Sequence, residues 1–408
     1  MAVQQIVIVG AGLAGAKTAQ ALRDKGYTGS ITLVGDEARR PYERPPLSKG
    51  FLQGKSPLDK AYVHEESWYA GHEVDLRLGV AVTTIDRSAR EVGLADGSRL
   101  PYDKLVLATG ASPRPLPGAE PGAAGVHYLR RAEDAERLKD LLGGIEGLLV
   151  VGAGWIGLEV TAAARAAGVR VTVLESLDLP LLRVLGPEIA QVFADLHTAH
   201  GVDLRLGTHL AGITPGATPS VELADGTRIE ADAVLVGIGA APNTALAEAA
   251  GLAVDNGVLV DAALRTSDPD VLAVGDVANA AHPVLGTRVR VEHWANALNQ
   301  PATAAATLLG EQAEYTNLPY FYTDQFDLGM EYVGHLGPDG YDRVVVRGEL
   351  DKREFIAFWL RGNRVRAAMN VNVWDVVGDL KALILSGKTV DPAALADLGT
   401  PLGGLVSQ

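Results

Sequence analysis

Short apolar runs, each followed by a glycine-rich turn and then by helical spacing, set the organisation of this chain. The first run covers residues 6–9 (IVIV) and the second covers residues 148–151 (LLVV). Runs that are this short and this uniformly apolar are typical of strands in a parallel sheet that is covered on both faces. The pattern predicts an α/β protein with two nucleotide-binding units.

The turn after each apolar run has the spacing GxGxxG. The first copy contains Gly10, Gly12 and Gly15 around Leu13 and Ala14, and the second contains Gly152, Gly154 and Gly157 around Trp155 and Ile156. One such motif is weak evidence, but a preceding strand and a following acidic residue strengthen it. Its glycines allow a tight turn and the approach of a pyrophosphate, which the helix N-terminus then binds. Two copies imply two dinucleotides and electron transfer between them.

An acidic residue ends the next apolar run after each motif. Asp36 follows residues 31–35, and Glu175 follows residues 169–174. A carboxylate at this place accepts hydrogen bonds from both ribose hydroxyls and repels a 2′-phosphate. Because no arginine directly follows Glu175, the sequence favours NADH over NADPH.

Later segments predict how the domains are connected. Residues 1–112 form a first unit that closes with a strand running into Ala108, Thr109 and Gly110, and residues 113–243 form a second unit that closes near Gly239. The proline- and glycine-rich stretch 113–125 is the expected linker. The strand 271–274, which runs into Gly275 and Asp276, is expected to return to the first sheet. Residues 244–319 would then complete the first domain around an inserted second one.

The last part of the chain has a different pattern. Helical spacing covers residues 292–309, and strand-like runs follow at 343–347, 355–360 and 365–370. A helix over residues 374–386 is expected to cover these strands. Residues 320–408 therefore predict a small C-terminal α+β domain.

Composition narrows the chemistry and the location. The 408-residue chain has no cysteine, so it cannot use a redox-active disulfide, a cysteine-ligated iron–sulfur cluster or covalently attached haem. We assign no metal-binding residue. The net charge of −14 disfavours nucleic acid and anionic membranes as partners. No apolar run is long enough to span a bilayer, and the first strand leaves no room for a signal segment, so a cytoplasmic location is expected.

Several motifs together carry a family resemblance. Besides the two glycine motifs, they are 44–49 (RPPLSK), 108–110 (ATG), 156–159 (IGLE), 273–276 (AVGD) and 292–297 (EHWANA). With these motifs the chain resembles, over essentially its whole length, the FAD-dependent, NADH-using ferredoxin reductases of bacterial haem-thiolate monooxygenases and ring-hydroxylating dioxygenases. Their wider fold family is that of glutathione reductase, with two Rossmann-like domains and a C-terminal α+β domain.

The resemblance implies that the first glycine motif binds FAD. Asp36 would bind the adenosine ribose and Asp276 the ribityl chain, while Lys49, Trp294 and Tyr322 would lie near the flavin. Further FAD contacts would come from the family's matching positions, which here are Leu13, Ala14, Arg44, Val82, Ala108, Thr109, Gly110, Arg130, Gly275, Glu292 and His293. For Trp294 and Tyr322 a plain role as core aromatics stays open.

The resemblance also implies that the second glycine motif binds NADH. Gly154, Trp155 and Ile156 would bind its pyrophosphate, Glu175 its ribose and Arg183 a phosphate or ribose, with Gly239 closing the site. Glu159 would lie near the nicotinamide and pair with Lys49. These two residues are the catalytic candidates, as groups that tune the flavin and position the nicotinamide. A surface role for Arg183 or Glu159 stays open.

The implied partner is an acidic [2Fe-2S] ferredoxin that binds transiently and accepts single electrons. Residues 295–309 carry no basic side chain for it, so the docking patch is expected to include Arg288 and Arg290, which precede Trp294. The next candidates are Arg361, Arg364 and Arg366. Two alternatives remain. One is an NADH-dependent reductase of a quinone or an organic radical, and the other is a redox-responsive interaction protein similar to apoptosis-inducing factor. The oligomeric state, monomer or weak dimer, is left open.

Overall fold

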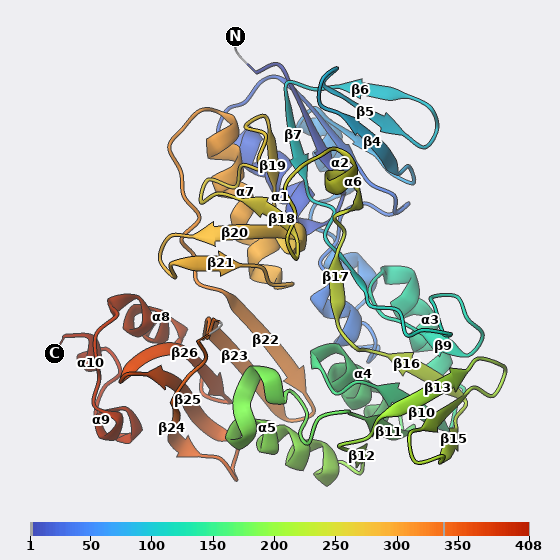
Figure 1. Ribbon diagram of the computed structural model, residues 1–408, viewed down its shortest axis with the longest axis vertical. Coiled ribbons are helices and arrows are strands. Elements are labelled where there is room, and N and C mark those ends of the chain that lie inside the picture. The colour runs from blue at the N-terminus through green and yellow to red at the C-terminus, as the bar shows by residue number, and fades with distance from the viewer. Residues whose placement is uncertain (1–2, 338, 408) are drawn as a thin grey trace. The chain divides into compact units, whose positions relative to one another are not determined.

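The computed structural model describes residues 3–337 and 339–407, which form two compact units (Figure 1). The first unit is bounded by the ranges 1–43, 61–112 and 240–320, and the second by 44–60, 113–239 and 321–408. Each unit therefore contains segments that are distant in the sequence. Each has a five-stranded parallel sheet, as the apolar runs predict.

The parallel sheet of the first unit has the strand order β19-β7-β1-β2-β3. Its strands are β1 (Gln5–Val9), β2 (Ser30–Val34), β3 (Val74–Arg77), β7 (Lys104–Leu107) and β19 (Val271–Ala273). The pairing of Val271 with Leu105 confirms the predicted return of the chain to this sheet. Helices α1 (Leu13–Asp24) and α7 (Trp294–Leu308) pack against each other, and α7 confirms the helix expected from residue 292.

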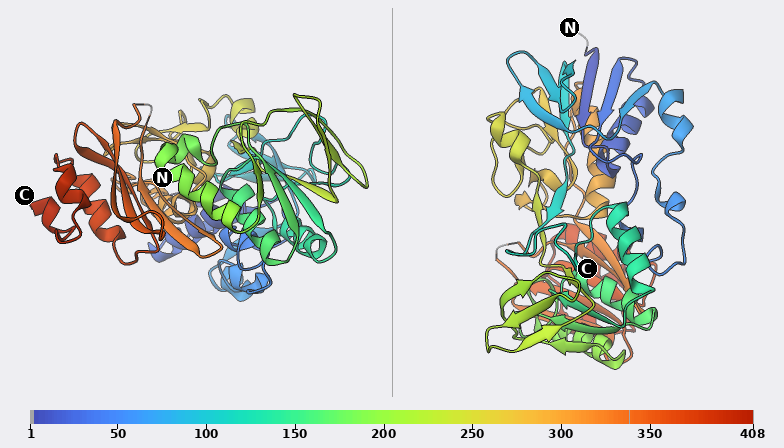
Figure 2. Two further views of the ribbon diagram at one scale, coloured as in Figure 1. Left: turned by 90° about the horizontal axis from the view of Figure 1, so that it is seen from below. Right: turned by 90° about the vertical axis from the view of Figure 1, so that its right-hand side faces the viewer.

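Smaller elements complete the first unit (Figure 2). An antiparallel sheet contains β4 (Val82–Asp86), β5 (Glu91–Leu94) and β6 (Arg99–Pro101), and another contains β18 (Val258–Val260), β20 (Ala278–His282) and β21 (Thr287–Val289). Strands β8 (Ala111–Pro113) and β17 (Ala240–Pro242) pair with each other. Short helices are α2 (Glu66–Gly71), α6 (Ala245–Ala249) and the 3₁₀ turn η3 (Gly275–Val277), while the 3₁₀ turn η2 (Leu58–Ala61) lies mostly in the second unit.

The parallel sheet of the second unit has the order β12-β11-β10-β16-β9. Its strands are β9 (Val126–His127), β10 (Gly147–Val151), β11 (Arg170–Leu174), β12 (Asp203–Arg205) and β16 (Ala233–Val236). Its helices are α3 (Ala132–Leu142), α4 (Trp155–Ala166) and α5 (Leu182–Ala199). A small antiparallel sheet contains β13 (Leu210–Thr214), β14 (Ser220–Leu223) and β15 (Arg228–Glu230).

The C-terminal residues form an antiparallel sheet with the order β22-β23-β26-β25-β24. Its strands are β22 (Tyr320–Gln325), β23 (Leu328–Gly334), β24 (Arg343–Glu349), β25 (Glu354–Arg361) and β26 (Arg364–Val371). The three predicted strands are confirmed as β24, β25 and β26. Helices α8 (Val377–Ser386), α9 (Pro392–Ala396) and α10 (Gly404–Ser407) follow. The expected helix begins at Val377 rather than at 374, because Asp375 has a positive φ of 64°, which a right-handed helix does not allow.

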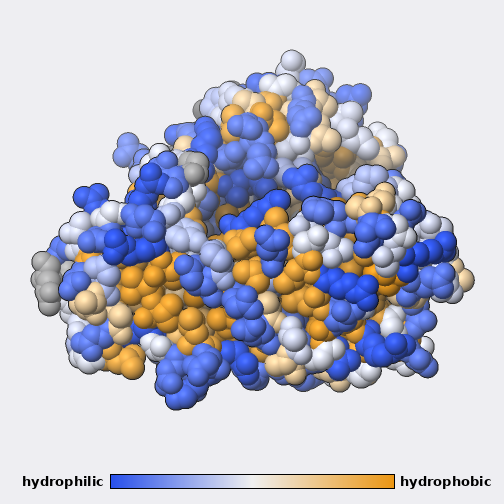
Figure 3. All heavy atoms as spheres, turned by 60° about the horizontal axis from the view of Figure 1, so that its bottom comes forward, coloured by the Kyte–Doolittle hydropathy of each residue, from blue (hydrophilic) through white to orange (hydrophobic). Residues whose placement is uncertain are grey.

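One apolar core joins the C-terminal sheet to the second parallel sheet. Phe193 of α5 and Trp359 of β25 are both fully buried in it, and the Trp359 indole donates a hydrogen bond of 3.0 Å to the Leu185 carbonyl. The surface remains partly apolar, as Figure 3 shows for one face, where orange hydrophobic areas lie between blue hydrophilic residues. The C-terminal sheet and the second Rossmann-like sheet thus share one buried interior.

Residues 44–60 pack differently from what their place in the sequence suggests. We expected them within the continuous segment 1–112, but they belong to the second unit, where the 3₁₀ turn η1 (Pro45–Ser48) lies. Leu52 joins the core that contains Leu138, and Lys49 pairs with Glu159. The division into FAD-binding, NADH-binding and C-terminal domains stays a prediction.

Candidate active site

The first glycine loop connects β1 to α1 in a form that suits a pyrophosphate. Gly10 has a φ of +113°, and a Cβ atom there would lie 2.2 Å from the Ala108 carbonyl oxygen. A Cβ atom on Gly15 would lie 2.1 Å from the Gly10 carbonyl oxygen, so α1 packs directly on the turn. At Gly12, in contrast, a Cβ atom would meet nothing within 4 Å. The loop is therefore tight where it packs on protein and open above the N-terminus of α1.

Other predicted residues of the first unit gather around this loop. Asp36 is exposed directly after β2. Gly275 lies against α1, since its Cβ would be 3.1 Å from the Ala14 Cβ, and its N–H donates to the Gln300 side chain at 2.7 Å. Asp276 follows in η3 and is 9% exposed. An acidic residue thus follows β2, and a second one follows the glycine that packs on α1.

Asn243, in the same unit, forms hydrogen bonds with the motif 108–110. The Thr109 hydroxyl donates to the Asn243 carbonyl oxygen at 2.8 Å, and the Asn243 side chain donates to the Thr109 carbonyl at the same distance. Val82 begins β4 in the small antiparallel sheet, and His293 directly precedes α7, whose first residue is Trp294.

The second glycine loop repeats the geometry of the first. Gly152 has a φ of +100°, and a Cβ on Gly157 would lie 2.2 Å from the Gly152 carbonyl oxygen. A Cβ on Gly154 would have its nearest neighbour at 3.8 Å, the Gly237 carbonyl oxygen. No side chain caps α4, so the backbone N–H groups of its first turn are open to a ligand.

Glu175 is attached to this loop by its own hydrogen bonds. One carboxylate oxygen accepts from the Ala153 backbone N–H at 2.8 Å, and the other accepts from the Leu177 N–H at 2.9 Å. The carboxylate therefore has a fixed position next to the open turn. The second of these oxygens, Oε1, also accepts from the Ser176 hydroxyl at 3.1 Å, so the further acceptor capacity for a ribose hydroxyl lies on Oε2.

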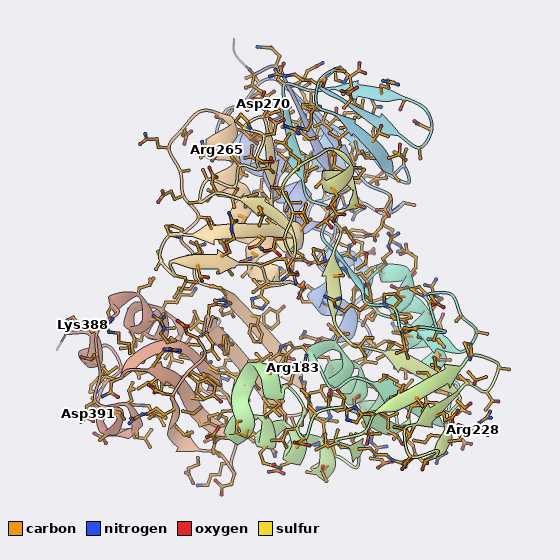
Figure 4. The ribbon with its side chains drawn as sticks, viewed as in Figure 1. Arg183, Arg228, Arg265, Asp270, Lys388 and Asp391 are labelled. Atoms are coloured by element: carbon orange, nitrogen blue, oxygen red, sulfur yellow. The ribbon has the colours of Figure 1, made fainter. Side chains whose placement is uncertain are left out.

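Arg183 is exposed on the first turn of α5 (Figure 4). This turn is separated from the rest of the helix by Gly186, which has a φ of +74°. Tyr341 packs closely on Gly186, and Trp359 binds the Leu185 carbonyl. The C-terminal sheet thus holds the turn that carries Arg183. Gly239, which closes β16, lies next to the Arg114 side chain.

The two catalytic candidates form an ion pair inside the second unit. Lys49 Nζ lies 2.8 Å from Glu159 Oε1, with side-chain exposures of 15% and 3%. The lysine also lies over the Tyr322 ring, 5.3 Å from its centroid. Glu159 is therefore not the surface carboxylate that its position on α4 left possible. A buried carboxylate needs partners such as this lysine, because an unpaired buried charge is costly.

Two hydroxyl groups that the sequence analysis did not assign complete the surroundings of Glu159. The Thr323 hydroxyl donates to Oε1 at 2.5 Å, and the Ser48 hydroxyl donates to Oε2. Ser48 lies inside the motif 44–49, but nothing in the sequence near 323 indicates this contact. Arg44, from the same motif, donates to the Arg130 carbonyl, so these two predicted residues also meet.

The two loops fit the dinucleotides that the motifs predict. Each leaves free space only at its second glycine, above a helix N-terminus, where a pyrophosphate would bind. In the first unit Asp36 directly follows β2 and Asp276 follows Gly275, which packs on α1, and this set of residues suits FAD. Glu175 flanks the loop of the second unit, which suits NAD(H).

Comparison with known proteins agrees with this arrangement. A family model described as pyridine nucleotide-disulphide oxidoreductase matches residues 4–301, and one described as the reductase C-terminal domain matches residues 320–406. The chain belongs to the pyridine nucleotide-disulphide oxidoreductase family. Enzymes of this family use FAD and NAD(H).

Individual relatives match along almost the whole chain. Putidaredoxin reductase CamA of Pseudomonas putida is 41% identical over 98% of this chain and 96% of its own length. The ferredoxin–NAD(+) reductase component of the anthranilate 1,2-dioxygenase system of Burkholderia cepacia is 41% identical over 97% and 98%. The crystal structure of the covalent putidaredoxin reductase–putidaredoxin complex matches with a TM-score of 0.95, at 41% identity, over 100% and 99% of the two chains.

Two further features of the chain narrow its function, the absence of cysteine and the character of its helices. The family takes its description from disulphide reduction, yet this chain has no cysteine that could form a disulfide. Among the residues that the structure describes, no helix is both long and apolar enough to cross a membrane.

Proposed function

We propose that this protein oxidises NADH and passes single electrons to a [2Fe-2S] ferredoxin that supplies an oxygenase. The observation that carries the proposal is the presence of two open glycine loops of the same geometry in one chain without cysteine. One loop would hold FAD and the other NADH, and with no disulfide available the electrons must leave from the flavin. The relatives named above, which include a ferredoxin reductase component, support the choice of acceptor.

The first unit would hold FAD. The N–H groups of Leu13 and Ala14, at the start of α1, bind the pyrophosphate, Asp36 binds the adenosine ribose and Asp276 binds the hydroxylated ribityl chain. Bound FAD supplies the conversion of a two-electron hydride transfer into one-electron steps. The protein contributes orientation and a defined electrostatic environment.

The second unit would hold NADH in a fixed position. Glu175 accepts hydrogen bonds from the ribose while its own bonds to the loop hold it in place, and Arg183 contacts a phosphate or ribose. Lys49 and Glu159 are the pair that tunes the flavin and positions the nicotinamide. Correct placement of the reacting groups supplies much of the rate in such reactions.

The ferredoxin would meet a local positive surface, because the whole protein is negatively charged. Of the two arginines before α7, Arg290 is only 10% exposed and pairs with Glu292. Arg288 donates from Nη1 to the Val260 and Asn279 carbonyls. The arginines of the C-terminal sheet, Arg361, Arg364 and Arg366, are exposed and form no ion pair among the described residues, although Arg361 donates to the Asp339 backbone carbonyl, and they are the better candidates.

Reduction of a small organic acceptor such as a quinone would use the same two sites and remains the second candidate. We further propose that the protein acts in the cytoplasm, where NADH is available to it. A purified protein with bound FAD tests both functions. NADH-driven cytochrome c reduction should depend on added [2Fe-2S] ferredoxin and should exceed the rate with quinones. Equal or faster quinone reduction would favour the second candidate.

A further inference from the structure

A continuous row of buried polar side chains leads away from Glu159 through the second unit. Thr323 donates to Glu159, Gln325 Nε2 donates to the Thr323 hydroxyl oxygen at 3.2 Å, and Gln325 Oε1 lies 2.9 Å from His197 Nε2. Thr323 and Gln325 are each 1% exposed, and His197 is fully buried. Polar groups this deep in an apolar core need a reason, because each costs free energy unless it is hydrogen-bonded.

Two elements bring the row together. Thr323 and Gln325 lie on β22, two residues apart, so they face the same side of the strand. His197 comes from the last turn of α5, beside the core that contains Phe193. The row therefore connects the helix of the second Rossmann-like sheet, through the first strand of the C-terminal sheet, to the ion pair of Lys49 and Glu159.

The hydrogen positions follow from the chemistry of each group. Glu159 accepts from Lys49 and therefore presents a carboxylate, so the Thr323 hydroxyl must donate to it. That hydroxyl oxygen then accepts from the Gln325 amide nitrogen, which leaves the Gln325 oxygen to accept from His197. Every hydrogen bond in the row is thus donated in the direction of Glu159.

The state of His197 agrees with this direction. Burial lowers the pKa of His197 to about 4, the hydrogen bond to Gln325 opposes that shift, and the nearby His200 charge adds to it. The ring is therefore neutral near pH 7 and has one N–H group, on Nε2. Its Nδ1 atom has no hydrogen-bond partner in the part of the chain that the structure describes, as expected for the unprotonated nitrogen.

We propose that Thr323, Gln325 and His197 are positioning residues that fix the Glu159 carboxylate in one orientation for Lys49. This proposal rests on the proposed function, since the row contacts the Lys49–Glu159 pair that is assigned to the flavin and the nicotinamide. Thr323 occupies one lone pair of Oε1, so Lys49 is restricted to another. Gln325 and His197 keep the threonine hydroxyl from rotating away. The ammonium group of Lys49 is then held in one place, which positioned chemistry requires.

The test removes the hydroxyl while keeping the shape of the side chain. Thr323→Val should lower the rate constant of flavin reduction by NADH about tenfold, the lower end of what a hydrogen bond to a charged group contributes. It should also shift the flavin midpoint potential, because Lys49 is no longer held. Gln325→Leu should act in the same direction with a smaller effect. Thr323→Ser, which keeps the hydroxyl, should restore both values.

Thr161→Val is the matched control. Thr161 is a fully buried threonine on the same helix as Glu159, but its hydroxyl donates to the Gly157 carbonyl at 2.7 Å and not to the row. It should leave the midpoint potential unchanged. A readout without flavin is nitrogen NMR of labelled histidine, which should show His197 protonated at Nε2 and disturbed by Gln325→Leu.

The outcomes separate this proposal from the proposed function. The positioning role is wrong if NADH reduces the flavin equally fast in wild type, Thr323→Val and Thr323→Ser and if the flavin midpoint potential is the same in all three. The proposed function stands in that case. If wild-type flavin is not reduced by NADH at all, the proposed function itself fails. If His197 carries its proton on Nδ1, the direction of the row is wrong. Should Thr323→Val fail to fold, Gln325→Leu and the NMR measurement still decide.

Discussion

At the scale of single residues, Glu175 should determine the choice between NADH and NADPH. Glu175→Ala removes both the ribose acceptor and the charge that repels a 2′-phosphate. One good hydrogen bond to a charged group contributes about 1.5–3 kcal/mol, so the preference for NADH should fall roughly tenfold to a hundredfold. Steady-state kinetics with both nucleotides measure the change.

Glu175→Gln is the informative comparison, because the carboxylate also holds the loop through Ala153. The amide oxygen can still accept from that N–H but carries no charge. Glu175→Gln should therefore keep more NADH affinity than Glu175→Ala and still tolerate NADPH better than wild type. Unchanged nucleotide selectivity in both variants would contradict the assignment of Glu175.

The buried ring of His197 should make the stability of the fold depend on pH. Its pKa is lowered from 6.5 to about 4 in the folded protein, so the unfolded chain binds the extra proton first as the pH falls. The free energy of unfolding should therefore fall between about pH 6.5 and pH 4, by up to about 3 kcal/mol from this residue. In His197→Gln the free energy of unfolding should depend less steeply on pH across this range. Part of the pH dependence should persist in this variant, because the pKa of His64 is also lowered to about 4.

Denaturant titrations across this pH range measure the effect. His209→Gln is the control, since His209 is exposed. An equal slope in wild type and in His197→Gln would show that the buried ring does not resist protonation in the folded state.

At the scale of elements, the strand–turn–helix units predict that the glycines of one motif differ in role. Gly154→Ala puts a Cβ in ordinary contact, 3.8 Å from its nearest neighbour, and fills the space above α4. NADH affinity should fall about tenfold while the unfolding midpoint stays near that of wild type. Gly157→Ala would put a Cβ 2.2 Å from the Gly152 carbonyl oxygen and should cost about 1–3 kcal/mol of stability.

Gly378→Ala on α8 is the control, because its Cβ would meet nothing and alanine favours the helix. Nucleotide titration and thermal unfolding of the three variants test the prediction. If Gly154→Ala destabilised the protein as much as Gly157→Ala, the open space would not be a ligand site.

The same elements show what the sequence could reveal. Strands β1 and β10 contain the apolar runs 6–9 and 148–151, and a glycine follows each strand, so the strands and the turns after them are predictable from local pattern. The sheets of β4–β6 and β13–β15 were not predicted, because their strands are short and only partly buried. The contacts of Thr323 and Gln325 join residues more than 100 positions apart in the chain, and no local pattern marks such pairs. The ion pair of Lys49 with Glu159 could be predicted only from the family resemblance.

At the scale of the whole molecule, a net charge of −14 opposes an acidic partner, so a local positive surface must bind it. Arg361→Glu with Arg364→Glu should raise the apparent KM for ferredoxin about tenfold at low salt, since steering charges act mainly on association. The effect should shrink as salt rises, because the Debye length is only about 10 Å at 0.1 M. NADH reduction of the flavin should not change.

Arg288→Glu with Arg290→Glu is the matched double variant. Arg290 already pairs with Glu292, so this variant should affect ferredoxin less than the C-terminal one does. If the Arg288 and Arg290 variant had the larger and salt-dependent effect, the docking surface would lie before α7 instead.

The most direct test of the ferredoxin reductase function is stopped-flow mixing of the FAD-loaded protein with NADH, followed by mixing with an oxidised [2Fe-2S] ferredoxin. We expect fast bleaching of the flavin absorbance by NADH, a slower reaction with NADPH, and then reduction of two ferredoxin molecules for each NADH consumed. Flavin reduction without electron transfer to any ferredoxin in a panel, together with fast reduction of quinones, would contradict this function.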